Sequence, residues 1–301
     1  MKNNKLNKKV IIGTWSLGGN YGHVNKKIIY KSIEKAINND FLEFDTSPNY
    51  GNGKMHNILS EILKNEKKIK INTKCGYNAD YIKTFKTQDI IRAIDSSLEK
   101  FGKINTLFLH NPRNEIKNWS KIINVLTKYK QKNHINSIGI SLARDFYFTK
   151  KIMNEFDYLQ DDINLLRPGK INYLTTFEPK IMARSPLASG CLSGKLSLKN
   201  KFSTLDHRSK WLSDKKRLKN ILFQINQIKK ITGKDLRSFA KNFLLQNKNI
   251  NKIIFGIKKP EHIDELIFDI KIKPDDFDLN CKKIFELYNR KFNLEKDQIG
   301  Y

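Results

Sequence analysis

Short apolar segments alternate with longer amphipathic segments along most of this 301-residue chain. The short segments are rich in β-branched residues, as buried strands are. Eight of them predict strands, at residues 10–14, 42–45, 69–74, 106–110, 137–141, 158–164, 181–185 and 253–257. The pattern therefore predicts a chain in which strands and helices alternate.

The segments between these strands have the apolar spacing of amphipathic helices. They predict helices at residues 27–38, 56–63, 89–101, 120–129, 216–228 and 235–245. The third is well bounded, because Thr87, Gln88 and Asp89 supply N-cap residue types and Gly102 follows as a helix stop. The gap after Gln160 has the weakest helix signal, since prolines and a glycine interrupt it.

Apolar strands separated by helices favour an α/β fold with parallel strands buried on both faces, either a closed barrel or an open doubly wound sheet. The sequence lacks GxGxxG, which argues against the open dinucleotide-binding sheet. No internal linker is rich in Pro, Gly or Ser, so we expect residues 1–301 to form one domain. Two further helices are predicted at 260–268 and 276–290, the second packing across the outside or bottom of the barrel.

The chain is strongly basic, with a formal net charge of +27 from 57 Lys and Arg against 30 Asp and Glu. Such a charge is compatible with a polyanionic partner. The lysines, however, are spread from Lys2 to Lys296 among many Asn and Ile residues, which indicates a compositional bias and no local patch. Without a recognisable binding module, we do not expect nucleic-acid binding.

Three cysteines, Cys75, Cys191 and Cys281, lie far apart with no CxxC spacing. They predict neither a disulfide framework nor a metal site. The first residues lack the apolar core of a signal peptide, and no segment approaches the ~20 apolar residues of a membrane span. We therefore expect a cytoplasmic protein without a membrane partner. Nothing in the sequence indicates an oligomeric state.

Titratable residues stand at the ends of three successive predicted strands. Asp45 ends the second strand, Lys74 the third and His110 the fourth, and Tyr50 follows Asp45 in the next loop. In a barrel the carboxyl ends of parallel strands converge on one face around a pocket. We therefore expect these four side chains to form an active site.

Their types suit hydride transfer to a carbonyl carbon, which leaves a negative charge on oxygen and needs a proton donor. Tyr50 is the candidate donor, and the Lys74 ammonium would favour its phenolate form. Asp45 would keep Lys74 charged and oriented, while His110 would hydrogen-bond the substrate carbonyl.

Each residue also has a structural interpretation when taken alone. Asp45 could cap a turn, Tyr50 could anchor a loop, Lys74 could extend its amine to solvent, and His110 could be a satisfied strand-end histidine. Their combination favours the catalytic interpretation.

The segments FDTSPNYG, INTKCG and FLHNP resemble the three segments that carry the catalytic tetrad of the aldo-keto reductase family. The similarity extends over nearly the whole chain, through IIGTWSLGG, SIGIS, YLQDDINLL, ARSPLASGCLSGK, LDHRS and FGIKKPEHIDEL. The resemblance implies a (β/α)8 TIM barrel that binds an extended nicotinamide cofactor without a Rossmann motif. It also implies that Tyr50 donates the proton, that Asp45 and Lys74 tune it, and that His110 orients the substrate.

By the same resemblance, Ser141 and Gln160 hold the nicotinamide carboxamide, although the Asn that usually follows the Ser is Leu142 here. Arg184 stands where many relatives place an aromatic ring against the nicotinamide, and a guanidinium can stack similarly. A plain surface arginine is the alternative.

Two further segments are implied to bind the rest of the cofactor. The segment along the pyrophosphate contains Ser185, Leu187 and Ser189. The loop and helix start that grip the adenosine contain Gly256, Lys258, Lys259, His262 and Glu265. Lys258 and Lys259 favour NADPH through its 2'-phosphate, with NADH as an alternative, and solvated lysines remain the structural interpretation. His262 stands in place of a frequent Arg, and Leu266 in place of an expected Asn.

Trp15, Tyr77, Asn111 and the segment near Trp119 are expected to frame the substrate pocket, with core packing as the alternative for both tryptophans. His56 replaces a common Glu, and we expect this change to affect a surface or helix contact. The leading hypothesis is an oxidoreductase that reduces an aldehyde or ketone, including sugar-derived ones, with NADPH. The alternative is an NADP(H)-binding regulatory or interaction barrel with little turnover, suggested by Leu142 and His262.

Overall fold

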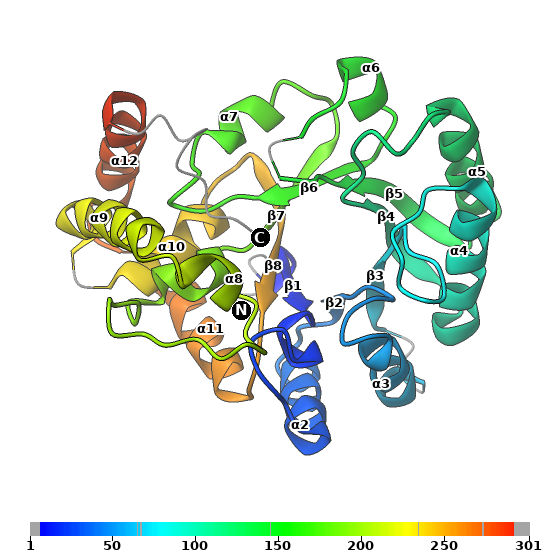
Figure 1. Cartoon of the computed structure of the whole chain (residues 1–301), viewed down its shortest axis with the longest axis horizontal. Coiled ribbons are helices and arrows are strands. Elements are labelled where there is room, and N and C mark those ends of the chain that lie inside the picture. Colours follow the sequence, from blue (N-terminus) through cyan, green and yellow to red (C-terminus); the bar gives the residue numbers. More distant parts are fainter. Residues whose placement is uncertain are drawn as a thin grey trace.

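The computed structural model describes residues 7–291 except 65, 67, 145, 234 and 273. Within these residues, eight parallel strands close into a barrel in sequence order, with β8 pairing with β1 (Figure 1). The strands are β1 Val10–Gly13, β2 Glu43–Asp45, β3 Lys70–Cys75, β4 Ile104–His110, β5 Ile135–Ser141, β6 Tyr158–Asp162, β7 Lys180–Arg184 and β8 Ile250–Gly256. The predicted (β/α)8 TIM barrel is confirmed.

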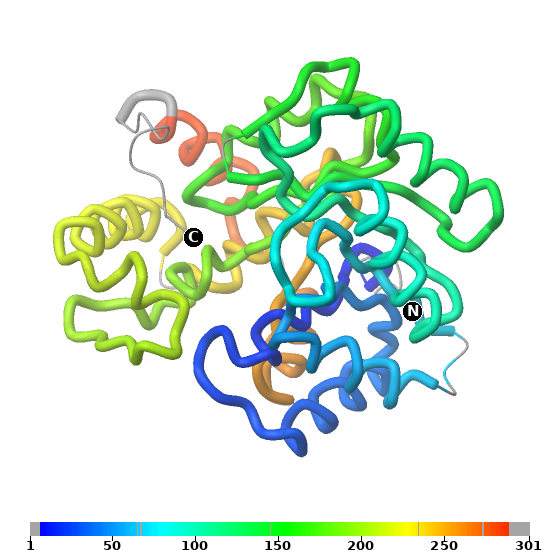
Figure 2. The backbone as a smooth tube through the Cα atoms, turned by 45° about the vertical axis from the view of Figure 1, so that its right-hand side comes forward, coloured from blue at the N-terminus to red at the C-terminus, as the bar shows by residue number. Residues whose placement is uncertain are grey.

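Helices surround the barrel, and a large segment after β7 projects to one side of it (Figures 1 and 2). The longer helices are α2 Lys26–Ile37, α3 Lys54–Leu63, α4 Thr87–Phe101, α5 Trp119–Gln131, α9 Lys215–Thr232, α10 Leu236–Leu245, α11 Glu261–Lys271 and α12 Phe277–Lys291. The short ones are η1 Ser16–Gly18, α6 Lys150–Met153, α7 Lys170–Leu174, η2 Ala188–Ser193 and α8 Ser209–Leu212. Both expected C-terminal helices are present, and α12 packs on α9 outside the barrel.

Several element boundaries differ from the predicted ones for a local reason. Both β4 and β5 begin two residues earlier than the apolar pattern indicates, because Asn136 Nδ2 donates to Asn105 Oδ1 (3.4 Å) and Asn105 Nδ2 donates to Asn72 Oδ1 (2.9 Å). These side chains satisfy one another, so polar residues are accommodated in the ladder. Helix α4 begins at Thr87 without a side-chain cap, because the residue at the cap position is Lys86 and the expected cap residues 87–89 lie in the first turn.

An apolar plug fills the inside of the barrel. It consists of Ile11, Phe108, Met182 and Ile254, all buried. The Phe108 ring fits only because β5 has a glycine beside it: a Cβ at Gly139 would lie 2.4 Å from that ring. Along β4 alternate residues face the same side, so His110, two residues beyond Phe108, lies above the plug at the carboxyl end of the strand.

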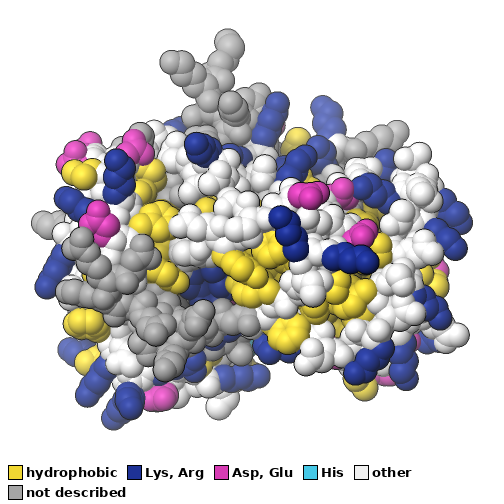
Figure 3. All heavy atoms as spheres, turned by 90° about the horizontal axis from the view of Figure 1, so that it is seen from above, with side chains coloured by type: hydrophobic (Ala, Val, Ile, Leu, Met, Phe, Trp, Pro, Cys, Tyr) yellow, Lys and Arg dark blue, Asp and Glu magenta, His cyan; other side chains and the backbone are white. Residues whose placement is uncertain are grey.

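Lysine and arginine side chains are scattered over the face seen in Figure 3, with apolar side chains between them. This distribution agrees with a compositional bias of the sequence toward lysine. Among the described residues, no helix is long and apolar enough to cross a membrane.

Candidate active site

A buried ion pair joins the ends of β2 and β3. Lys74 Nζ lies 2.7 Å from Asp45 Oδ1 and also donates to the carbonyl oxygen of Thr46 (2.9 Å). Lys74 is 1% exposed and Asp45 is 3% exposed, so both charges are withdrawn from water. Burial alone would lower the pKa of Lys74, but Asp45 and Tyr50 hold that pKa above its ordinary value. The strand ends therefore present a fixed ammonium group.

Tyr50 lies in the loop after β2, with Lys74 Nζ 4.9 Å from the centre of its ring. The following turn needs glycine, because Gly51 has a φ of +60° and a Cβ there would lie 2.9 Å from the Gly18 carbonyl oxygen. Burial raises the pKa of Tyr50 above its ordinary value, and Lys74 opposes this increase without cancelling it. Tyr50 therefore holds its proton at neutral pH.

His110, at the end of β4, is 7% exposed and lies against two tyrosine rings. Its ring centre is 6.1 Å from that of Tyr50 and 5.2 Å from that of Tyr77. Burial, together with the charges of Lys74 and Arg184, lowers its pKa well below the ordinary value. The imidazole is therefore neutral at physiological pH, and all four predicted catalytic side chains lie in one cluster.

Gln160, at the centre of β6, reaches across the barrel to this cluster. Its Nε2 donates to Asp45 Oδ2 (3.3 Å) and lies 3.5 Å from Met182 Sδ. Its Oε1 is buried and has no hydrogen-bond partner among the described residues. An unsatisfied buried acceptor is costly unless a ligand completes it, and the carboxamide N–H of a nicotinamide fits that requirement. Beside it, Ser141 Oγ lies 3.3 Å from the Asn111 side chain.

Arg184, at the end of β7, is held by two acceptors. Its Nη1 lies 2.8 Å from Asp162 Oδ1, and its Nη2 donates to the carbonyl oxygen of Leu142 (2.9 Å). The alternative of a plain surface arginine does not describe this side chain, which is largely buried in an ion pair. Leu142 itself is fully buried in the core, so its side chain offers no polar contact.

The segment after β7 has an unusual backbone. Ser185, Ala188 and Ser189 have φ values of +57°, +46° and +56°, and Gly190 follows at +89°. Non-glycine residues in this region are strained, and such strain concentrates at binding sites. Leu187, the residue before η2, lies within this segment and has an ordinary negative φ of -99°. The structure thus gives the predicted pyrophosphate segment a constrained conformation.

The predicted adenosine residues gather where β8 leads into α11. The Lys258 ammonium donates to the carbonyl oxygen of Tyr21, and the backbone N–H of Lys258 donates to His262 Nδ1 (3.2 Å). Lys259 is exposed, with Glu261 3.9 Å away. Gly256 is the last residue of β8. Lys259 is therefore the more accessible of the two lysines.

Two residues that sequence reasoning missed also belong here. Arg237 on α10 lies 3.2 Å from Glu265, the predicted adenine contact, and its only sequence signal is that it is one of two charged residues on this helix. Ser47 lies 3.1 Å from His110 Nδ1 and is fully buried. The sequence did contain a signal for Ser47, because it is a polar residue between Asp45 and Tyr50 in FDTSPNYG, the predicted catalytic segment.

The predicted pocket residues divide into two groups. Tyr77 lies against His110. Asn111, the residue after His110, has a φ of +52°. Trp15 packs edge-on against Tyr21 at 5.0 Å, and the carbonyl oxygen of Tyr21 accepts from Lys258 of the predicted adenosine segment.

Trp119 instead packs against Phe148 (4.5 Å) and Phe156 (6.5 Å), which is the core-packing alternative. His56 is buried, and its Nε2 lies 2.8 Å from Thr73 Oγ1. Of the two expected effects, a helix contact therefore holds, because His56 joins helix α3 to strand β3 and does not lie on the surface.

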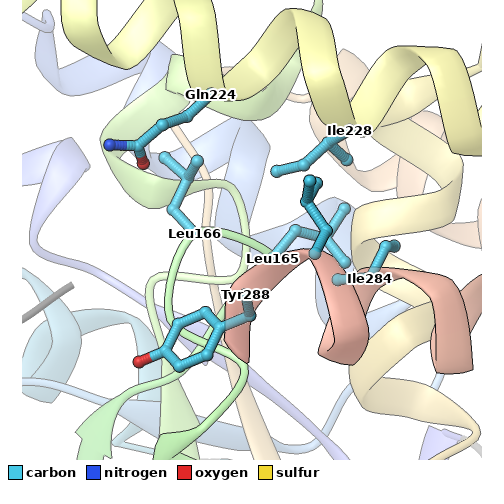
Figure 4. Close-up of a pocket in the computed structure, with 7 residues that line it drawn as sticks. Leu165, Leu166, Gln224, Ile228, Ile284 and Tyr288 are labelled. Atoms are coloured by element: carbon cyan, nitrogen blue, oxygen red, sulfur yellow. The ribbon is translucent and has the colours of Figure 1, made fainter. Parts of the chain in front are cut away.

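A separate cavity lies between α9 and α12 (Figure 4). Its walls are mainly apolar and include none of the tetrad residues: Leu165, Leu166, Gln224, Ile228, Ile284, Leu287 and Tyr288. Among the described residues no charged side chain lines this cavity, so they offer no chemistry comparable to that of Asp45, Tyr50, Lys74 and His110.

Comparisons with known proteins found relatives that match most of the chain. The chain is 23% identical over 284 residues to aldo-keto reductase YhdN of Bacillus subtilis (strain 168), covering 86% of this chain and 83% of that protein. It is 24% identical over 273 residues to L-galactose dehydrogenase of Arabidopsis thaliana, covering 84% and 81%.

Similar solved structures include the glycerol dehydrogenase AKR11B4 from Gluconobacter oxydans, with a TM-score of 0.74, 20% identity and coverage of 94% of this chain and 91% of that one. The holo form of aldo-keto reductase AKR11C1 from Bacillus halodurans has a TM-score of 0.72 at 16% identity, covering 92% and 91%. At such identities these structures establish the fold. The sequence model of the Aldo/keto reductase family matches residues 9–280. The chain therefore belongs to the aldo/keto reductase family of NAD(P)H-dependent oxidoreductases, which reduce carbonyl compounds.

Proposed function

We propose that this protein reduces an aldehyde or ketone with NADPH and that Tyr50 donates the proton to the carbonyl oxygen. One observation carries the proposal: a buried ammonium, Lys74, lies between the Asp45 carboxylate and the Tyr50 ring. Sugar-derived carbonyls are the first substrates to test, because two of the similar proteins are named as dehydrogenases of a sugar and of a polyol.

The nicotinamide cofactor, when bound, supplies the hydride. Gln160 would hold its carboxamide through the buried Oε1, with Ser141 beside it on the neighbouring strand. The strained run at Ser185 to Ser189 would follow the pyrophosphate. Each of these contacts is a proposal about this chain's residues and is tested by cofactor affinity.

The proton step follows from the charges around Tyr50. Its raised pKa keeps the phenol protonated, so a proton is available at neutral pH. As the substrate oxygen takes that proton, negative charge appears on the phenolate, and the Lys74 ammonium at 4.9 Å from the ring stabilises it. Asp45 keeps Lys74 in place, and neutral His110 orients the substrate oxygen.

The preference for NADPH rests on the charge at the start of α11. Lys259 is exposed there, whereas the Lys258 ammonium is engaged by Tyr21. We therefore assign the 2'-phosphate first to Lys259.

The test is purified protein assayed for NADPH oxidation with a panel of aldehydes, ketones and reducing sugars. Tyr50→Phe should abolish turnover while NADPH still quenches protein fluorescence. Tyr173→Phe is the matched control, because Tyr173 is 42% exposed on α7 and should leave turnover unchanged. NADPH binding without turnover on any carbonyl would favour a regulatory or interaction barrel, and equal turnover in Tyr50→Phe would refute the mechanism.

We also propose that residues 1–301 act as one barrel domain and that the protein works in the cytoplasm. Free thiols at Cys75, Cys191 and Cys281 are typical of that reducing compartment. Fractionation of cells that express the native chain tests this assignment.

A further inference from the structure

A short polar chain runs from the loop after β2 to the imidazole of His110. Ser47 Oγ lies 2.6 Å from Asn49 Oδ1 and 3.1 Å from His110 Nδ1. Ser47 is fully buried and His110 is 7% exposed, so bulk water does not compete freely for these atoms. The Asp45-to-Tyr50 loop thus has a second connection to the catalytic cluster besides Lys74.

We propose that Ser47 is a positioning residue that decides which ring nitrogen of His110 carries the proton, and that Asn49 competes for the hydroxyl proton that Ser47 uses. The consequence for catalysis rests on the proposed function, because it concerns the hydrogen bond from His110 to the carbonyl oxygen of the substrate. The tautomer itself is a property of the free protein.

The number of protons that Ser47 and His110 can donate decides the tautomer. A serine hydroxyl has one proton to donate, whereas an amide oxygen can only accept. At 2.6 Å, Asn49 Oδ1 is the nearer acceptor and takes that proton. Ser47 Oγ then accepts from His110 Nδ1–H at 3.1 Å. Because burial keeps the imidazole neutral, its other nitrogen, Nε2, is left without a proton.

A carbonyl oxygen is an acceptor and therefore requires Nε2–H. The productive arrangement is reached when the Ser47 hydroxyl turns from Asn49 to His110 Nδ1 and the imidazole proton resides on Nε2. Ser47 enables this change because it can donate in either direction. Asn49 opposes it, since the Ser47–Asn49 hydrogen bond is lost in the productive state.

The tautomer can be observed without any turnover, by nitrogen NMR of protein labelled at its histidine rings. His110→Gln identifies the His110 signals among those of the six histidines. We expect wild type to show protonated Nδ1. Asn49→Ala should move the proton to Nε2, because Ser47 then has only Nδ1 to donate to. An unchanged tautomer in Asn49→Ala would overturn the proposal.

Kinetics provide the second measurement. Asn49→Ala should raise kcat/KM for carbonyl reduction by about fivefold, and Ser47→Ala should lower it by about as much, the usual effect of one hydrogen bond. In the Ser47→Ala/Asn49→Ala protein the gain from Asn49→Ala should vanish, since Ser47 transmits it. An equal gain in both backgrounds would mean that Asn49 acts through loop structure and would refute the role of Ser47.

The two proposals fail in distinguishable ways. If no carbonyl is reduced but the tautomer changes as stated, the proposed function fails and the role of Ser47 stands. If carbonyls are reduced but the tautomer of Asn49→Ala stays on Nδ1, the role of Ser47 fails alone.

Discussion

Gln160 Nε2 lies 3.3 Å from Asp45 Oδ2, so the sixth strand is joined to the second across the barrel. The other oxygen of the same carboxylate holds Lys74 at 2.7 Å. The Asp45 side chain therefore supports both the Lys74 ammonium beside Tyr50 and the Gln160 amide that we propose holds the cofactor.

Replacing Gln160 tests its share of this arrangement. Gln160→Met keeps the volume but removes both the Oε1 acceptor and the bond to Asp45. We expect the Kd for NADPH to rise about tenfold, the effect of losing a buried hydrogen bond, as measured by fluorescence titration. Gln224→Met, a buried glutamine on α9, is the control and should bind NADPH normally. Equal binding by Gln160→Met would contradict the proposed contact.

Lys74→Met removes the ammonium and leaves the Asp45 carboxylate buried without its partner. The free energy of unfolding should fall by about 3 kcal/mol, and kcat by at least on the order of a hundredfold. The second substitution Asp45→Asn, made in the Lys74→Met protein, should restore stability but not turnover. Lys170→Met breaks another buried pair, with Asp161, and should lose stability while folded molecules retain kcat. Normal kcat in Lys74→Met would refute the role of Lys74.

His56 predicts a dependence of stability on pH. Burial lowers its pKa to about 3, so the folded protein keeps it neutral while the unfolded chain binds a proton near the ordinary value of 6.5. The contribution of His56 to the free energy of unfolding is fully present above that ordinary pKa and is lost progressively as the pH falls below it. At pH 5 the loss is about 2 kcal/mol.

Chemical unfolding of wild type and His56→Gln between pH 7 and pH 5 measures this loss. The variant should be less dependent on pH by that amount, whereas His134→Gln, at an exposed position, should behave as wild type. Parallel pH curves for wild type and His56→Gln would show that the buried histidine is not responsible.

Lys259→Ala tests the cofactor preference. If the exposed ammonium binds the 2'-phosphate, the KM for NADPH should rise about fivefold and that for NADH should hardly change. Lys271→Ala, at the far end of α11, removes the same charge from the same helix and should leave both constants unchanged. Equal increases for both cofactors would point to a general loss of binding.

The barrel was predictable because buried parallel strands need apolar runs. The clustering of Asp45, Lys74 and His110 was predictable because those runs end in them. What sequence could not provide was the pairing of residues far apart in the chain. Arg184 bonds the Leu142 carbonyl, and the Lys258 ammonium bonds that of Tyr21. Both acceptors are backbone groups, which every residue has, so no residue type indicates them.

The balance around Tyr50 was likewise beyond the sequence. Burial raises the pKa of Tyr50 and Asp45 adds to the increase, so the opposing charges of Lys74 and Arg184, which favour the phenolate, are outweighed. Burial is a property of the assembled barrel, and a motif does not report it.

The plug of Ile11, Phe108, Met182 and Ile254 closes the inside of the barrel, so the barrel is not an open channel. With the interior closed, the proposed cofactor and carbonyl compound would both reach and leave the site at the carboxyl ends of the strands. Of two molecules bound there, the one that lies deeper would have to arrive before the other and leave after it.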